Sequence, residues 1–134
     1  MTFITPKDRW EETRYSAKTA SVAIQPYSFL KYDGSGGVEP ATGGNSISIC
    51  GIATEPVLAT DSDYSGTRQV PYMTVLDRLL LIPIGAGTAT AAMVGNTYNL
   101  HDAVSLDVSG AGYQVVVTKF ISTTLVEGKV VLVS

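Results

Sequence analysis

His101 is the single histidine of the chain, so nucleophilic or acid–base catalysis would have to be built around it. A Ser-His-Asp or Cys-His arrangement needs an imidazole that takes the proton of the nucleophile. Asp102 follows His101 directly, and neighbouring side chains in an extended segment point to opposite faces. We therefore expect His101 to be a loop or surface residue, and we predict that the protein has no catalytic residues and is not an enzyme.

Metal ligands are also scarce. One histidine and one cysteine, Cys50, are too few for the common zinc sites. Residues 61–66 (DSDYSG) have Asp at alternate positions and a later Gly, as calcium loops do, but Tyr72 stands where the bidentate Glu is needed. Asp and Gly are equally typical of turns. We expect no metal site, and we expect Cys50, in the apolar run 47–50, to be a small buried hydrophobe.

The glycine-rich stretches do not predict a phosphate-binding site. Residues 33–37 (DGSGG) lack the Lys-Ser/Thr ending of a P-loop. Residues 85–88 (GAGT) begin like a dinucleotide-binding motif, but Thr90 stands where the third Gly is needed. We therefore expect no cofactor.

The amino-acid composition limits the kinds of molecule that the protein is expected to bind. The 134 residues fit one domain, and only 16% are charged while 45% are hydrophobic. This balance indicates that part of the surface is covered by something else. The net charge of −3 and the lack of a Lys/Arg cluster argue against nucleic acid. No signal-peptide core or membrane-length apolar run is visible, so we expect synthesis in the cytoplasm and no membrane partner.

Turn signals recur about every eight to twelve residues, a spacing typical of sandwiches and barrels. Strand-like segments alternate with Gly, Asp and Asn clusters, and no long amphipathic helix is available to cover a parallel sheet. We predict an all-β fold, a small β-barrel or β-tulip-like domain of short strands over residues 21–134. Residues 1–20 are more polar, hold the only Trp and lack an apolar stripe, so we predict an extended N-terminal arm.

Several segments of the β-like region carry a recognisable pattern, namely residues 20–30 (ASVAIQPYSFL), 51–53 (GIA) with 57–61 (VLATD), 71–84, 94–100 (VGNTYNL) and 128–133. Together these segments resemble the tailed-phage head decoration, or capsid cement, proteins. The resemblance covers residues 20–134 in outline, and residues 61–69 (DSDYSGTRQ) are longer and more polar than the pattern. It implies a compact β domain, preceded by a polar arm, that binds the outside of a phage capsid and stabilises it.

The resemblance also implies the partners. These would be the major capsid protein and further copies of the chain, as a dimer or trimer, on the exterior of a virion assembled in the host cytoplasm. Within the arm we expect Arg9, Trp10, Arg14 and Tyr15 to make the protein contacts, because arginine and aromatic residues dominate interface hot spots.

Other functions remain open at this point. The first alternative is another phage structural protein, such as a tail-tube or head-completion component, which would form closed rings. A dUTPase-like all-β hydrolase would need an Asp-bearing substrate motif with nearby Gly and Tyr, which we cannot assemble here. A carbohydrate-binding β-sandwich would use exposed Tyr and Trp side chains.

Overall fold

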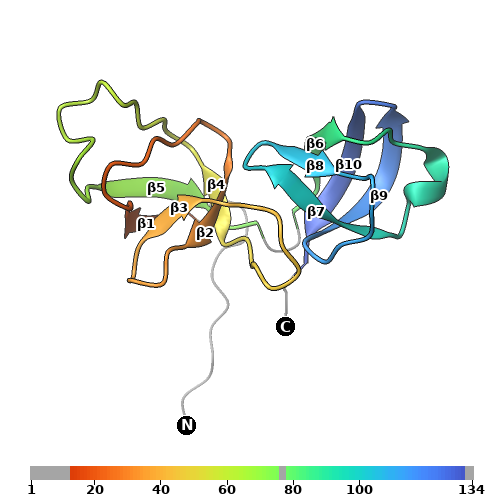
Figure 1. Cartoon of the computed structure of the whole chain (residues 1–134), viewed down its shortest axis with the longest axis horizontal. Coiled ribbons are helices and arrows are strands. Elements are labelled where there is room, and N and C mark those ends of the chain that lie inside the picture. Colours follow the sequence, from red (N-terminus) through yellow and green to blue (C-terminus); the bar gives the residue numbers. More distant parts are fainter. Residues whose placement is uncertain (1–12, 76–77, 132–134) are drawn as a thin grey trace, which may run out of the picture.

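The computed structural model of the chain describes residues 13–75 and 78–131, and over these ranges the chain is all-β. The predicted fold class is therefore confirmed. One short 3-10 turn, η1 (Ala91–Met93), interrupts the strands. Figure 1 shows two groups of short strands side by side, one built from each half of the chain. No helix in the described ranges is long and apolar enough to cross a bilayer.

The first half of the chain forms an antiparallel sheet with the strand order β1-β5-β4-β2-β3. A single parallel bridge, Lys18 to Val38, brings the end of β1 against β3 at the opposite edge, so the sheet curls round a core of its own. Its strands are β1 (Thr13–Ala17), β2 (Phe29–Tyr32), β3 (Val38–Pro40), β4 (Gly51–Ala53) and β5 (Gln69–Met73).

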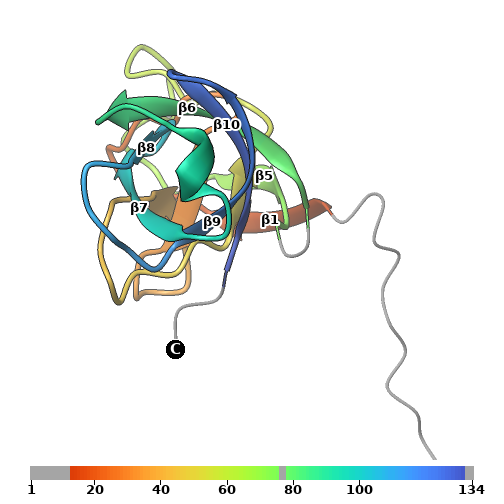
Figure 2. The same ribbon diagram turned by 90° about the vertical axis from the view of Figure 1, so that its right-hand side faces the viewer.

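The second half closes into a small barrel with the strand order β10-β6-β8-β7-β9. Figure 2 looks into this ring. The β6–β8 contact is parallel, and the other strand pairs of the ring are antiparallel. Its strands are β6 (Leu80–Ala86), β7 (Thr97–Asp102), β8 (Ser105–Asp107), β9 (Val115–Ser122) and β10 (Leu125–Val130). A barrel is thus present, but it uses only the second half of the chain.

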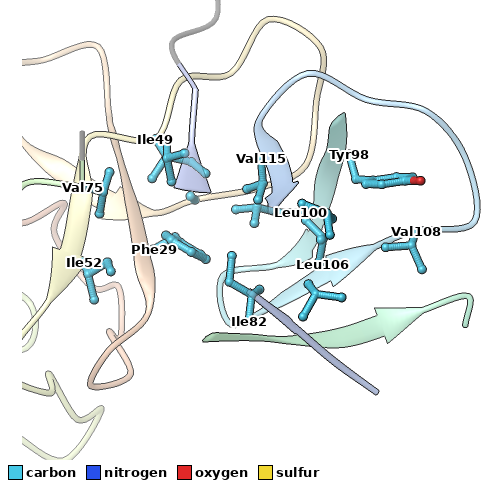
Figure 3. Close-up of a cluster of buried hydrophobic side chains, with 14 of the residues drawn as sticks. Phe29, Ile49, Ile52, Val75, Ile82, Tyr98, Leu100, Leu106, Val108 and Val115 are labelled. Atoms are coloured by element: carbon cyan, nitrogen blue, oxygen red, sulfur yellow. The ribbon is translucent and has the colours of Figure 1, made fainter. Parts of the chain in front are cut away.

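The larger hydrophobic core spans both halves. Phe29, Ile52 and Val75 of the first half belong to the same buried cluster as Ile82 and Leu100 of the barrel. Figure 3 shows the Phe29 ring between Ile52 and Val75 on one side and Ile82 on the other. Since burial of apolar area stabilises a fold by about 25 cal/mol per Å², the shared cluster couples the two halves energetically.

Gln114, just before β9, joins the loop between β3 and β4 to the barrel. Its side chain is fully buried and all of its hydrogen-bonding atoms are engaged. Nε2 donates to the carbonyl oxygens of Thr42 and Ile47, both at 2.9 Å, and Oε1 accepts from the N–H groups of Leu100 at 2.8 Å and Gly44 at 3.3 Å. A buried loop without such a partner would leave its backbone polar groups unsatisfied.

Part of the predicted arm lies within the sheet. Residues 1–12 are outside the described residues, but Thr13–Ala17 pair along their whole length with β5, and Lys18 is buried. The sequence pattern missed this strand because most of its residues are polar, its first three residues are exposed and none of the five is fully buried. A truncation that tests the arm should therefore end at residue 12, since removal through residue 18 would delete a strand.

Candidate protein-docking surface

An apolar groove of about 220 Å³ lies where the first sheet meets β6. None of the residues that form its walls is charged. Three of them, Phe29, Ile52 and Met73, are cross-strand neighbours in β2, β4 and β5, so their side chains form one row on the same face of the sheet. The lining residues are Tyr27, Phe29, Ile52, Met73, Leu80, Leu81, Ile82, Pro83 and Val104.

Tyr27 projects from a turn at the rim of this groove. Pro26 precedes it, and the Ser28 N–H and hydroxyl both donate to the carbonyl oxygen of Gln25, at 3.3 and 2.7 Å. Tyr27 has φ of 58°, a left-handed conformation that type II turns normally give to glycine. For a residue with a Cβ this conformation costs about 1–2 kcal/mol. The strained turn nevertheless presents a tyrosine that is 74% exposed, and such strain is concentrated at functional sites.

Strand β6 forms the opposite rim. Its side chains alternate, so that Ile82 faces the core while Leu81 points outward and is 65% exposed. Pairing with β8 begins at Ile84. Among the described strands, the flank of Leu80–Pro83 away from β10 therefore has no hydrogen-bonded neighbour. Pro83 is suited to such an edge because it has no N–H to leave unpaired.

The groove has the composition of a protein-binding site. Contiguous exposed apolar patches are uncommon on monomeric proteins and mark sites of interaction. The cores of protein interfaces are depleted of charge and rich in aromatic side chains. Here an exposed tyrosine, Tyr27, and an exposed leucine, Leu81, line an uncharged hollow. This arrangement can dock an apolar segment.

The sequence prediction missed this surface. Nothing in the sequence analysis singled out residues 27–32 or 78–84 as a binding surface, because apolar residues indicate burial by default. The signals that could have revealed it were Pro26 followed by Tyr27, where a turn needs a residue with positive φ, and an apolar run too dense for one-sided burial.

The four predicted contact residues do not form one cluster in the described part of the chain. Arg9 and Trp10 lie outside the described residues. Arg14 and Tyr15 lie on β1, opposite Tyr72 and Pro71 of β5. Adjacent side chains of a strand point to opposite faces, so Arg14 and Tyr15 project from opposite faces of this edge strand. Tyr15 is largely exposed.

His101 and Asp102 lie at the exposed end of β7. The Asp102 carboxylate accepts hydrogen bonds from the Ser105 hydroxyl at 2.7 Å and the Val104 N–H at 2.9 Å. The Ser105 bond is the main cause that lowers the pKa of Asp102. This carboxylate thus holds the β7–β8 turn. Over residues 13–75 and 78–131 no group of three His, Cys, Asp or Glu side chains is placed to hold a metal.

In the calcium-like loop of residues 61–66, the positive charges near the oxygen atoms belong to two side chains of the protein, Lys18 and Arg68. The Lys18 Nζ donates to the carbonyl oxygens of Tyr64 at 2.6 Å, Gly66 at 2.8 Å and Thr19 at 3.2 Å, and it lies 5.4 Å from the centre of the Tyr64 ring. Lys18 is only 1% exposed. The buried ammonium group of Lys18 therefore holds the loop in place through these hydrogen bonds.

Arg68 engages the two carboxylates of the same loop. Its guanidinium lies 3.0 Å from Asp63 and 3.5 Å from Asp61, and it also donates to the carbonyl oxygen of Pro56 at 3.2 Å. Asp61 in addition accepts the N–H of Leu58 at 3.0 Å. The carboxylates of Asp61 and Asp63 thus stabilise the conformation of the loop itself.

Cys50 is half-buried rather than fully buried, and packs against the core of the first sheet. Burial raises the pKa of its thiol to about 11. Because the thiolate is the reactive form, a rise from about 9 to about 11 lowers its population at neutral pH about a hundredfold. We expect labelling by a disulfide reagent at pH 8 to be at least about tenfold slower in the native protein than in urea, because the higher intrinsic nucleophilicity of a thiolate with a raised pKa offsets part of the smaller population. Equal rates in both conditions would show that the thiol is open to solvent.

Comparisons with protein-family models, with curated proteins and with solved structures found no match. The geometry of the groove, its uncharged walls and the strained Tyr27 turn are thus the basis for a functional proposal.

Proposed function

We propose that this protein is a structural virion protein that binds the outer surface of a tailed-phage capsid and stabilises it, as decoration or cement proteins do. The observation that carries the proposal is the apolar groove with the exposed Tyr27 at its rim. Its partners would be the major capsid protein and further copies of the same chain, as a dimer or trimer. The resemblance of residues 20–134 to decoration proteins supplies the identity of the shell.

The groove and the exposed Tyr27 suit a protein that coats a capsid. A shell presents many equivalent sites, so modest contacts repeated by symmetry are sufficient for a stable coat. An apolar hollow with an aromatic anchor provides a contact of this kind without any catalytic group. The predicted arm contacts, Arg9, Trp10, Arg14 and Tyr15, belong to the same proposal as additional points of attachment.

The test uses phage heads that lack the protein. We expect the wild-type chain to co-sediment with matched heads and to raise their temperature of disruption. Tyr27→Gly should weaken binding at least about tenfold, which corresponds to the loss of about 1.4 kcal/mol at one hot spot. Its own free energy of unfolding should stay within about 1 kcal/mol of wild type, because glycine adopts the left-handed conformation without strain.

The matched control is Tyr113→Gly, which removes another exposed tyrosine that does not line the groove. This variant should bind heads like the wild type. If Tyr27→Gly also binds like the wild type, the groove is not the docking surface. If the wild-type chain fails to associate with heads, the capsid proposal itself is wrong.

A second structural role would give a different result in the same experiment. A tail-tube or head-completion component would assemble into closed rings without heads. Light scattering and electron microscopy of the purified chain distinguish this alternative, since a decoration protein should not form tubes or rings alone.

A further inference from the structure

We infer that a second hollow, on the barrel, binds an uncharged saccharide. It lies between residues 95–98, where β7 begins, and the loop that follows β8, which contributes Val108, Gly110 and Ala111. Its volume of about 470 Å³ falls within the range of about 300–1,000 Å³ that is usual for small-molecule sites. The hollow shares no lining residue with the apolar groove, and the inference does not rest on the capsid proposal.

Hydrogen bonds hold both walls of this hollow in place. The Gly112 N–H donates to the carbonyl oxygen of Thr97 at 3.0 Å, and the Thr97 hydroxyl donates to the carbonyl oxygen of Gly112 at 2.7 Å. The Gly95 N–H donates to the carbonyl oxygen of Val117 in β9 at 2.8 Å. The loop packs so closely on β7 that a Cβ at Gly112 would collide with the backbone nitrogen of Asn99. The walls are therefore preformed, and a ligand can bind without first ordering a loop.

The hydroxyl of Tyr98 is a polar group with no partner among the described residues. The side chain is only 6% exposed and its ring packs in the larger core. Figure 3 shows the hydroxyl pointing away from the other labelled core side chains. Within residues 13–75 and 78–131 no enclosed side-chain oxygen lacks a hydrogen bond, so this unbonded hydroxyl is open to the hollow that Tyr98 lines. The packed ring fixes its position, and the hydroxyl can both donate to a ligand and accept from it.

The other lining residues select a neutral ligand that carries hydroxyl groups. None of the seven lining residues is charged, so an anion meets no cationic side chain and a cation meets no carboxylate. The amide of Asn96, like the Tyr98 hydroxyl, both donates and accepts, which is what sugar hydroxyls require. Val108 and Ala111 offer apolar surface to the C–H groups of a sugar ring. Gly110 keeps the space open, since a Cβ there would meet no protein atom.

An array of immobilised oligosaccharides, probed with the labelled full-length protein, tests the inference. We expect binding to a subset of the neutral oligosaccharides. Sulfated or sialylated forms of the same glycans should bind no better, because no cationic side chain lines the hollow. In nuclear magnetic resonance spectra, the strongest neutral binder of the array should shift the amide signals of Gly95, Gly110 and Ala111 more than those of the groove residues.

Tyr98→Phe removes only the hydroxyl and keeps the buried ring. The variant should keep the wild-type melting temperature, because this hydroxyl makes no hydrogen bond to the described residues. Its affinity for the same glycan should fall at least about tenfold, which corresponds to about 1.4 kcal/mol for one lost hydrogen bond. The matched control is Tyr15→Phe, which removes the hydroxyl of an exposed tyrosine on β1 and should bind like the wild type.

Three results would overturn the inference. They are the absence of binding to every neutral oligosaccharide, binding to charged glycans alone, and wild-type affinity in Tyr98→Phe. Phage heads play no part in these measurements, so a failure of the capsid proposal is distinguished from a failure of this one.

Discussion

Gln114→Glu is expected to lower the free energy of unfolding by about 3–5 kcal/mol at pH 7, a large share of the stability of a domain of this size. The wild-type amide nitrogen donates to the carbonyl oxygens of Thr42 and Ile47. A carboxylate at this buried position has no proton to donate, and its charge faces two oxygen atoms. Urea unfolding followed by circular dichroism measures the loss.

The loss should depend on pH with a definite sign. Burial and the two carbonyl oxygens disfavour the charged form, so the pKa of the new carboxyl should be higher in the folded state than its unfolded value of about 4.3. Destabilisation is therefore smallest below about pH 4 and grows as the pH rises through the folded-state pKa. Even the protonated acid has one donor where the amide has two, so wild-type stability is not regained.

Gln69→Glu provides the control for this prediction. It makes the same change on β5, where the side chain is exposed. It should alter the free energy of unfolding by less than about 0.5 kcal/mol both at pH 7 and at about pH 4. A small and pH-independent effect of Gln114→Glu would mean that the loop of residues 41–50 can move away from the barrel without loss. It would contradict the role assigned to Gln114 as the joint between the two halves.

Lys18→Met is expected to destabilise the protein by about 2–4 kcal/mol, because three carbonyl oxygens then lose a charged donor. Methionine keeps most of the length of the side chain, so the change isolates the ammonium group. The loss should be localised: amide hydrogen exchange should accelerate over residues 58–68, which Lys18 and Arg68 hold in place. Exchange in the barrel strands should be accelerated far less.

Lys31→Met is the comparison for this second prediction. Lys31 forms a partly exposed ion pair with Glu39 at 3.7 Å, and such pairs contribute about 0–1 kcal/mol. If the two variants have the same small effect, the Lys18 hydrogen bonds are replaced by water when they are removed. The buried ammonium would then be incidental to the loop.

The fold class could be predicted from the sequence because turn residues and short strand-like runs repeat along the whole chain. The division into a curled sheet and a barrel could not, since it depends on which strands pair. β1 and β5 are joined by pairs such as Tyr15 with Pro71, far apart in the sequence. Polar residues in β1 gave no periodic signal, and its membership of the sheet follows from tertiary pairing that overrides local preference.

The site was harder to predict for a related reason. Hydrophobic residues indicate burial by default, and the exposure of Tyr27 and Leu81 is set by neighbours that are distant in sequence. Lys18 illustrates the opposite case: a lysine predicts a solvent-exposed surface, yet two carbonyl groups of a remote loop make its burial favourable. In both cases the deciding contacts are non-local.

The pairing of the first strand also sets an order of assembly. Leu125 and Ser122 face each other in the β9–β10 hairpin across two intervening residues, whereas Ala17 meets Gln69 only when the 51 residues between them have been closed into a loop. Hairpins form within about 1–10 μs, and closure of long loops raises the entropic barrier to the contacts that need them. The barrel hairpin should therefore form early, and β1 should join the sheet among the last steps. Strand β1, to which the N-terminal residues are attached, therefore takes its place in the sheet only when the rest of the fold is complete.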